Sequence, residues 1–147
     1  MCCLREYGAL FLGNPVRQDI LEIKNKRAEA IQYFDLDAQN KTVLVVGGSL
    51  GARTINESMA LCLDMLSNEN TQLIWQTGKN YAEQAAKEAE GKIHVKVMPF
   101  IAKMDLAYAA ADIIVSRAGA STISELCLIG KLSLIHISEP TRPRLIS

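Results

Sequence analysis

The chain has 147 residues, which is long enough for one domain with a buried core. Hydrophobic residues make up 49% of it and charged residues 22%, as in an ordinary globular protein, and sixteen basic residues balance sixteen acidic ones. This balance gives no electrostatic reason to expect nucleic acid as a partner, and no apolar run approaches the ~20 residues that span a membrane.

Residues 1–40 are interpreted as a linking segment that contains one helix. Residues 13–17, Gly-Asn-Pro-Val-Arg, predict a turn, because the residue before a proline avoids the helical region. Apolar residues then recur near one face from Gln18 to about Phe34 and predict a helix. These residues are Ile20, Ile23, Ile31 and Phe34. The charged stretch at residues 22–29 indicates a helix that is mostly solvated.

Residues 41–53, Lys-Thr-Val-Leu-Val-Val-Gly-Gly-Ser-Leu-Gly-Ala-Arg, organise the rest of the chain. The apolar run at 43–46 predicts a strand buried on both faces, as in a parallel sheet. The glycines that follow permit a tight turn and a close approach of the backbone to a ligand. A helix then begins, and its unpaired N–H groups and positive dipole end suit a phosphate.

Two other phosphate-binding patterns do not fit this turn. A dinucleotide fingerprint requires G-x-G-x-x-G and an acidic residue about 20 positions later. Ser49 stands at the second glycine position, and the next strand ends in Gln-Thr-Gly at 76–78 without an acid. A Walker A loop requires lysine after its last glycine, and here Gly51 is followed by Ala52 and Arg53.

The remaining chain alternates predicted helices and strands. The expected helices are 53–66, 81–90, 104–111 and 121–129, and the expected strands after the first are 72–76, 93–98 and 112–116. This alternation predicts an α/β fold with a Rossmann-like parallel sheet. Ligands of such sheets lie beyond the carboxyl ends of the strands, where residues 47–51, 100–101 and 116–121 are expected.

The cysteines and histidines carry no predicted chemistry. The four cysteines lack the spacing of a metal site, so we expect no metal. Cys62 and Cys127 fall on apolar faces of predicted helices, and we expect both to be reduced core residues. His94 belongs to an alternating strand and is expected at the surface or half-buried. Neither His94 nor His136 has a partner at catalytic spacing, so neither is assigned an acid–base role.

Four segments together resemble the C-terminal domain of the MurG family of glycosyltransferases. They are Gly-Asn-Pro-Val-Arg at 13–17, Gly-Gly-Ser-Leu-Gly-Ala-Arg at 47–53, Pro-Phe-Ile at 99–101 and Ser-Arg-Ala-Gly-Ala-Ser-Thr-Ile-Ser-Glu at 116–125. The match covers residues 13–131 in the order and rough spacing of the family. Four motifs in register are far more specific than one glycine loop.

The resemblance implies the C-terminal half of a GT-B glycosyltransferase, truncated here. The family transfers GlcNAc from UDP-GlcNAc to lipid I and forms lipid II, with inversion and without a tightly bound cofactor, in peptidoglycan synthesis. Its acceptor site, membrane-facing patch and proposed catalytic base belong to an N-terminal domain that this chain lacks. The implied location is cytoplasmic, with the full-length family at the inner face of the cell membrane. We therefore assign no catalytic residue and expect no transferase activity from this polypeptide alone.

The resemblance also implies a set of donor-binding residues. Arg17 matches an arginine near the donor diphosphate, although a solvated arginine at the start of a helix remains an alternative. Gly48 and Ser49 match the glycine loop that contacts the donor, whereas a turn serine that caps its helix is the alternative for Ser49.

The same resemblance assigns the nucleoside part of the donor. Ile101 matches the position that holds the uracil through backbone groups, and an apolar loop anchor is the alternative. Glu125 matches the ribose-binding glutamate, but Thr122-x-x-Glu125 is also a capping-box pattern. The rest of that pocket is assigned to Ala120, Ser121, Thr122, Ile123 and Ser124.

After Lys131 the sequence departs from the family. Residues 132–147 resemble translated sequencing-adapter DNA and are interpreted as a non-native tail, which leaves 41–131 as an incomplete UDP-GlcNAc-binding domain. Three hypotheses stay open: the donor-binding part of a MurG-like enzyme, a non-catalytic nucleotide-sugar-binding module, and an unrelated α/β domain such as half of a dehydrogenase. The missing acid after the second strand counts against the third.

Overall fold

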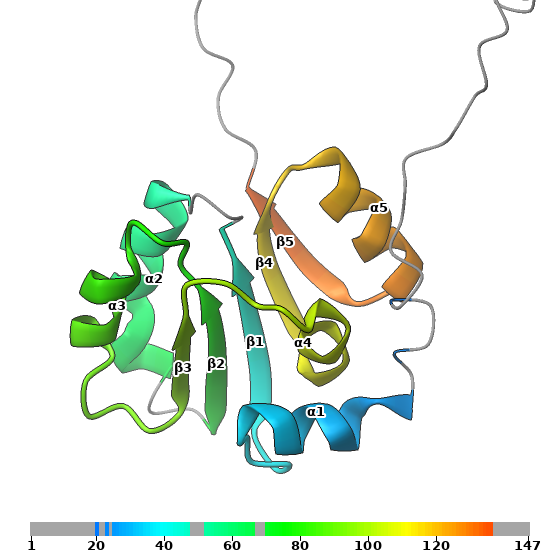
Figure 1. Ribbon diagram of the computed structural model, residues 1–147, viewed down its shortest axis with the longest axis horizontal. Helices are drawn as coiled ribbons and strands as arrows, with labels where there is room; N and C mark the ends of the chain where they lie inside the picture. Colours follow the sequence, from blue (N-terminus) through cyan, green and yellow to red (C-terminus); the bar gives the residue numbers. More distant parts are fainter. Residues whose placement is uncertain (1–19, 21–22, 24, 48–51, 67–69, 137–147) are drawn as a thin grey trace, which may run out of the picture.

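The computed structural model describes residues 20, 23, 25–47, 52–66 and 70–136 (Figure 1). Its helices are α1 (Arg27–Phe34), α2 (Arg53–Leu66), α3 (Ala82–Glu88), α4 (Met104–Ala110) and α5 (Ala120–Ile129). Its strands are β1 (Lys41–Val46), β2 (Thr71–Gln76), β3 (Val95–Met98), β4 (Ile113–Arg117) and β5 (Leu132–His136). The five strands form one parallel sheet in the order β3-β2-β1-β4-β5, which confirms the predicted Rossmann-like α/β fold.

Helices cover both faces of this sheet, because alternate strand residues point to opposite sides. Val45 of β1 and Leu73 and Trp75 of β2 pack with α2 and α3 in one apolar cluster. Leu44 of β1 lies in a second cluster on the other face, where α1, α4 and α5 pack (Figure 1). The central strands are therefore buried on both sides, as their continuous apolar runs predict.

The first helix is shorter than the sequence predicts. The predicted helix starts at Gln18, whereas α1 begins at Arg27, and Ile20 and Ile23 precede it in short 3₁₀ turns. The two isoleucines are 1% and 6% exposed, which agrees with their predicted place on the apolar face of this segment. Both isoleucines and Phe34 pack in the same core cluster.

Both predicted core cysteines are exposed. In α2 the buried residues are Ile55, Asn56 and Leu63, so the buried stripe turns away from Cys62. Asn56 belongs to the buried face of α2 because its side chain makes two buried hydrogen bonds. It donates to the Thr77 carbonyl at 2.8 Å and accepts from Trp75 Nε1 at 3.1 Å. The helix α5 buries only Leu126, which leaves the adjacent Cys127 in solvent.

The segment after Lys131 supplies the last strand of the sheet. Residues 132–136 form β5 and pair in parallel with β4, from Ile113 opposite Leu132 to Arg117 opposite His136. The origin assigned to residues 132–147 from the sequence stays a prediction, and residues 137–147 lie outside the described part. In the fold, the residues that follow Lys131 occupy the position of the next parallel strand beside β4.

Candidate functional site

The strand order creates a crevice between β1 and β4. The chain leaves β1 toward α2 on one face and leaves β4 toward α5 on the other, so the two connections diverge at the carboxyl edge. Ligands of open α/β sheets bind at this kind of switch point. A hollow is present there, and its lining residues are Val46, Gly47, Arg117, Ala118, Gly119 and Thr122.

The end of β1 and Gly47 form one side of this hollow. Gly47 is buried, and its N–H donates to the Gln76 carbonyl at 3.3 Å, which holds the end of β1 against β2. Gly48 and Ser49, the predicted ligands of the turn, lie outside the described residues, as does Arg17. The structure therefore gives the position where the turn begins and where α2 follows it at Arg53.

The start of α5 forms the other side of the hollow. Gly119 is the N-cap residue, and the first bond inside the helix runs from the Ile123 N–H to the Gly119 carbonyl at 2.9 Å. The N–H groups of the first turn have no acceptor within the helix, and the N-cap residue Gly119 supplies no side-chain cap. With the helix dipole and the exposed Arg117, this end of the hollow is suited to an anion.

The predicted residues of α5 divide by their exposure. Thr122 lines the hollow and is half-buried. Ala120, Ser121 and Ile123 are exposed, while Ser124 is half-buried and donates its hydroxyl to the Ala120 carbonyl at 3.0 Å. The structure thus brings Thr122 together with Gly47, and it presents the other residues on the same two helical turns.

Glu125 does not cap its own helix. The capping-box alternative requires Thr122 at the N-cap, but that position is Gly119 and Thr122 lies inside α5. Instead, Glu125 Oε2 accepts a hydrogen bond from the Tyr108 hydroxyl at 2.9 Å. The carboxylate is half-buried and is held one helical turn beyond Thr122.

Ile101 is an anchor of the loop after β3. Its side chain is 2% exposed and packs in the same core cluster as Tyr108 and Leu126. Its side chain therefore offers no surface to a base, and the predicted uracil contact can use only the backbone of this loop. Ile101 is not one of the described residues that line the hollow between β1 and β4.

Three residues near the crevice carry features that the sequence prediction missed. Tyr108 lies in the alanine-rich helix α4 and is buried, so in the sequence only its hydroxyl group sets it apart from an apolar core residue. Arg117 ends β4 beside the hollow. The Ser116 hydroxyl is buried, at 1% exposure, and has no hydrogen-bond partner in the described part of the chain. The sequence feature that could have identified them is a polar group at the carboxyl end of a buried strand, or a polar group that faces that end.

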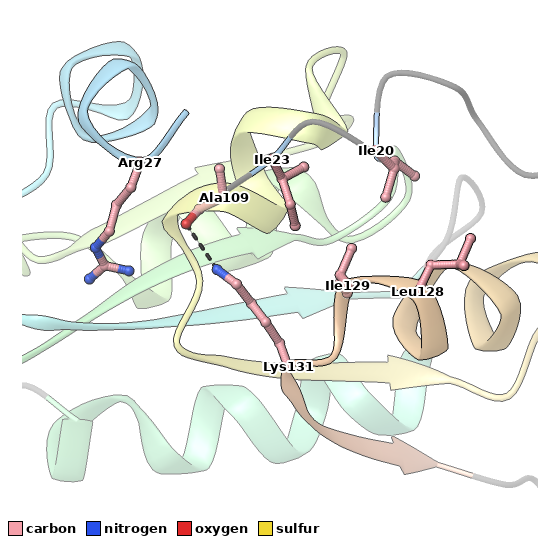
Figure 2. A pocket seen from close by; sticks show the side chains of 7 residues that line it. All are labelled: Ile20, Ile23, Arg27, Ala109, Leu128, Ile129 and Lys131. Atoms are coloured by element: carbon pink, nitrogen blue, oxygen red, sulfur yellow. Dashed lines mark hydrogen bonds between the residues drawn. The ribbon is translucent and has the colours of Figure 1, made fainter. Parts of the chain in front are cut away.

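A second hollow lies at the far end of α4 (Figure 2). Its lining residues are Ile20, Ile23, Arg27, Ala109, Leu128, Ile129 and Lys131. The ammonium of Lys131 points toward Ala109 at the end of α4, where it donates to the carbonyls of Tyr108 at 2.7 Å, Ala109 at 2.9 Å and Ala111 at 2.6 Å. Arg27 donates to the remaining carbonyl, that of Ala110, at 2.9 Å.

These two cations close the carboxyl end of α4, where orphan carbonyls and the negative dipole end favour positive charge. Burial lowers the pKa of Lys131, and the nearby Arg27 lowers it further. Asp112 joins Arg27 at 3.2 Å and accepts the Thr42 N–H at 2.8 Å. Burial opposes ionisation of Asp112, but these hydrogen bonds outweigh it and hold its pKa below the ordinary value.

Neither a metal nor a membrane span is indicated in the described ranges. No group of three or more histidine, cysteine, aspartate or glutamate side chains there is arranged to hold a metal ion. None of the helices between residues 20 and 136 that the structure describes is long and apolar enough to cross a bilayer. His94 is half-buried, as the sequence predicts.

The sequence is similar to known transferases over most of its length. A protein of Flavobacterium psychrophilum named UDP-N-acetylglucosamine--N-acetylmuramyl-(pentapeptide) pyrophosphoryl-undecaprenol N-acetylglucosamine transferase is 53% identical over 131 residues, which is 89% of this chain and 35% of that protein. A protein of the same name from Parabacteroides distasonis is 54% identical over 121 residues, 81% of this chain and 33% of that protein. The chain thus spans about a third of the length of the curated relatives it matches.

The fold and the family model agree with this similarity. The crystal structure of MurG from Acinetobacter baumannii superposes with a TM-score of 0.66 at 27% identity, over 92% of this chain and 38% of that one. The model of the glycosyltransferase family 28 C-terminal domain matches residues 42–142. These findings confirm the resemblance drawn from the four motifs and the predicted GT-B half. The chain therefore belongs to the family of glycosyltransferase family 28 C-terminal domains.

Proposed function

We propose that this chain is the donor-binding part of an inverting glycosyltransferase that transfers GlcNAc from UDP-GlcNAc to lipid I and forms lipid II. The family membership and the printed names of the relatives support the reaction. One observation of this chain carries the assignment of the donor: the exposed Arg117 and the start of α5 line one hollow at the switch point of the sheet, and Glu125, bonded to Tyr108, follows one turn later on α5.

The crevice suits the three parts of a uridine diphosphate. The diphosphate lies against the amides of residues 47–51 and 119–122, with Arg17 and Arg117 supplying positive charge. Ser49, Thr122 and their neighbours contribute hydroxyl and amide donors. The ribose diol donates to Glu125, and the uracil edge pairs with the backbone at Ile101. The remaining residues of the pocket are Gly48, Ala120, Ser121, Ile123 and Ser124.

The chemistry of transfer belongs to the longer protein. The acceptor, lipid I, and the contact with the membrane are assigned to an N-terminal domain, at the cytoplasmic face of the cell membrane. No cofactor is required, and none of the residues named here acts as the catalytic base. We therefore expect this chain to bind the donor and to leave lipid I unchanged. A non-catalytic nucleotide-sugar-binding module would use the same crevice, and transfer activity of a longer protein that contains this chain separates the two.

A titration with UDP-GlcNAc, followed through backbone amide shifts, tests the proposal. We expect the largest shifts in residues 116–125 and in the loop after β3. Glu125→Ala and Arg17→Ala should each weaken binding, since each removes a proposed contact. Tyr81→Phe is a matched control, because its hydroxyl contacts Glu88 on α3 and not the crevice. Unchanged affinity in both alanine variants, or shifts centred on α3, would remove the assignment.

A further inference from the structure

The carboxylate of Glu125 is held by a residue that no sequence motif included. The Tyr108 hydroxyl donates to Glu125 Oε2 at 2.9 Å, across the interface between α4 and α5. Tyr108 is 2% exposed and packs in the core, so its ring has one position available. A tyrosine fixed in this way can hold a flexible glutamate at a defined place.

A second contact fixes the same tyrosine through its backbone. Lys131, which follows α5, donates to the Tyr108 carbonyl at 2.7 Å. Glu125 within α5 and Lys131 beyond its end are thus both tied to Tyr108 of α4. Because these two hydrogen bonds lie at different positions along α5, together they oppose both sliding and rotation of α5 against α4. The start of α5 and the carboxylate of Glu125 are therefore placed as one unit.

The hydrogen bond leaves half of the carboxylate available. In the part of the chain that the structure describes, the Tyr108 hydroxyl is the one hydrogen-bond donor to Glu125, and it uses Oε2. An ionised carboxylate has about four acceptor sites on its two oxygens, so Oε1 can accept two hydroxyl donors. Two adjacent hydroxyl groups on a sugar ring offer that pair of donors.

We propose that Tyr108 is a positioning residue that fixes the Glu125 carboxylate for the vicinal diol of the donor ribose. This inference rests on the proposed function, since it takes the nucleoside of the donor as the ligand. The tyrosine touches no substrate and acts through the glutamate alone. Its contribution is preorganisation: the side-chain order of Glu125 is set before the ligand arrives.

The test compares two nucleotides on four proteins and one control variant. Calorimetric affinities for uridine diphosphate and for 2′,3′-dideoxyuridine diphosphate are measured with the unsubstituted chain, Tyr108→Phe, Glu125→Ala and the double variant. Tyr81→Phe again serves as the matched control, because it also removes a hydroxyl from a tyrosine–glutamate pair, that of Tyr81 and Glu88. The ratio of the two affinities reports the diol, and folding is checked by circular dichroism.

We expect Tyr108→Phe to lower this ratio by about threefold to tenfold, the loss that corresponds to one typical hydrogen bond. The affinity for the dideoxy nucleotide should hardly change. In the Glu125→Ala background the tyrosine substitution should have no further effect on the ratio. An unchanged ratio in Tyr108→Phe, or an equal loss for both nucleotides, would overturn the positioning role while leaving the donor site intact.

Failure of the proposed function has a different signature. If the unsubstituted chain bound both nucleotides equally, or neither, the ribose assignment would fall and the inference with it. If Tyr108→Phe did not fold, Glu125→Asp replaces it, because the shorter side chain stops short of the Tyr108 hydroxyl while Glu125 itself is only half-buried. A full diol preference retained in Glu125→Asp would then contradict the role of Tyr108.

Discussion

Removing the charge of Lys131 should destabilise the whole fold, because one ammonium satisfies three carbonyls at the end of α4. The change Lys131→Met keeps an unbranched side chain beside Ile129 and removes only the donors. The three acceptors belong to Tyr108, Ala109 and Ala111, all buried residues. An unsatisfied buried carbonyl costs about 1–3 kcal/mol.

The expected loss of stability is smaller than the sum of the penalties for three unsatisfied carbonyls. Lys131 is half-buried, so water can reach part of the vacated space, and the variant avoids the cost of desolvating an ammonium. We therefore expect a decrease of about 2–3 kcal/mol in the free energy of unfolding. For a chain of this size, that corresponds to a fall of about 5–10 °C in melting temperature.

Urea unfolding followed by tryptophan fluorescence measures this loss. Trp75 is the single tryptophan and is fully buried in the described structure, so its emission reports exposure of the core. The control is Lys79→Met, at an exposed lysine in the turn after β2. A loss below about 0.5 kcal/mol for Lys131→Met, as expected of an ordinary surface substitution, would refute the cap at the end of α4.

Three further predictions follow from single contacts. The lowered pKa of Asp112 means that its pairing with Arg27 stabilises the fold above about pH 4 and ceases to do so as pH falls through the folded pKa; urea unfolding should show a deficit of Asp112→Asn at pH 7 that shrinks in acid. Asn56→Leu should cost about 2–3 kcal/mol, since Trp75 Nε1 loses its buried acceptor; an equally stable variant in the same assay would contradict this. Arg117→Ala should weaken calorimetric binding of uridine diphosphate about threefold to tenfold at low ionic strength and less at high ionic strength; a loss independent of salt would exclude a charge contact.

The sheet was predictable from the sequence because its strands are short apolar runs that alternate with helices. The glycine turn, the loop after β3 and the start of α5 fall at one edge as a consequence of parallel topology alone. The same reasoning placed Gly47 and residues 116–121 at one edge without knowledge of any distance, and Thr122 was added through the family resemblance. These features depend on local pattern and on a general rule of connection.

Contacts between elements far apart in sequence were not predictable. Asn56 turns the buried face of α2 away from Cys62 through bonds to residues about 20 positions later, and no helical periodicity contains that information. The capping-box interpretation of Glu125 failed because Tyr108, 17 residues earlier, takes the carboxylate. The start of α1 at Arg27 rather than at Gln18 was likewise not predicted from the periodicity.

A crystal structure of the chain with uridine diphosphate bound would locate the ligand directly. The diphosphate should lie between the turn after β1 and the first turn of α5, and the ribose hydroxyls should lie within hydrogen-bond distance of Glu125. The Tyr108 hydroxyl should still contact the other oxygen of that carboxylate. Uridine diphosphate bound instead in the hollow beside Lys131, or on the outer face of α2 and α3, would contradict the donor site at the β1–β4 crevice.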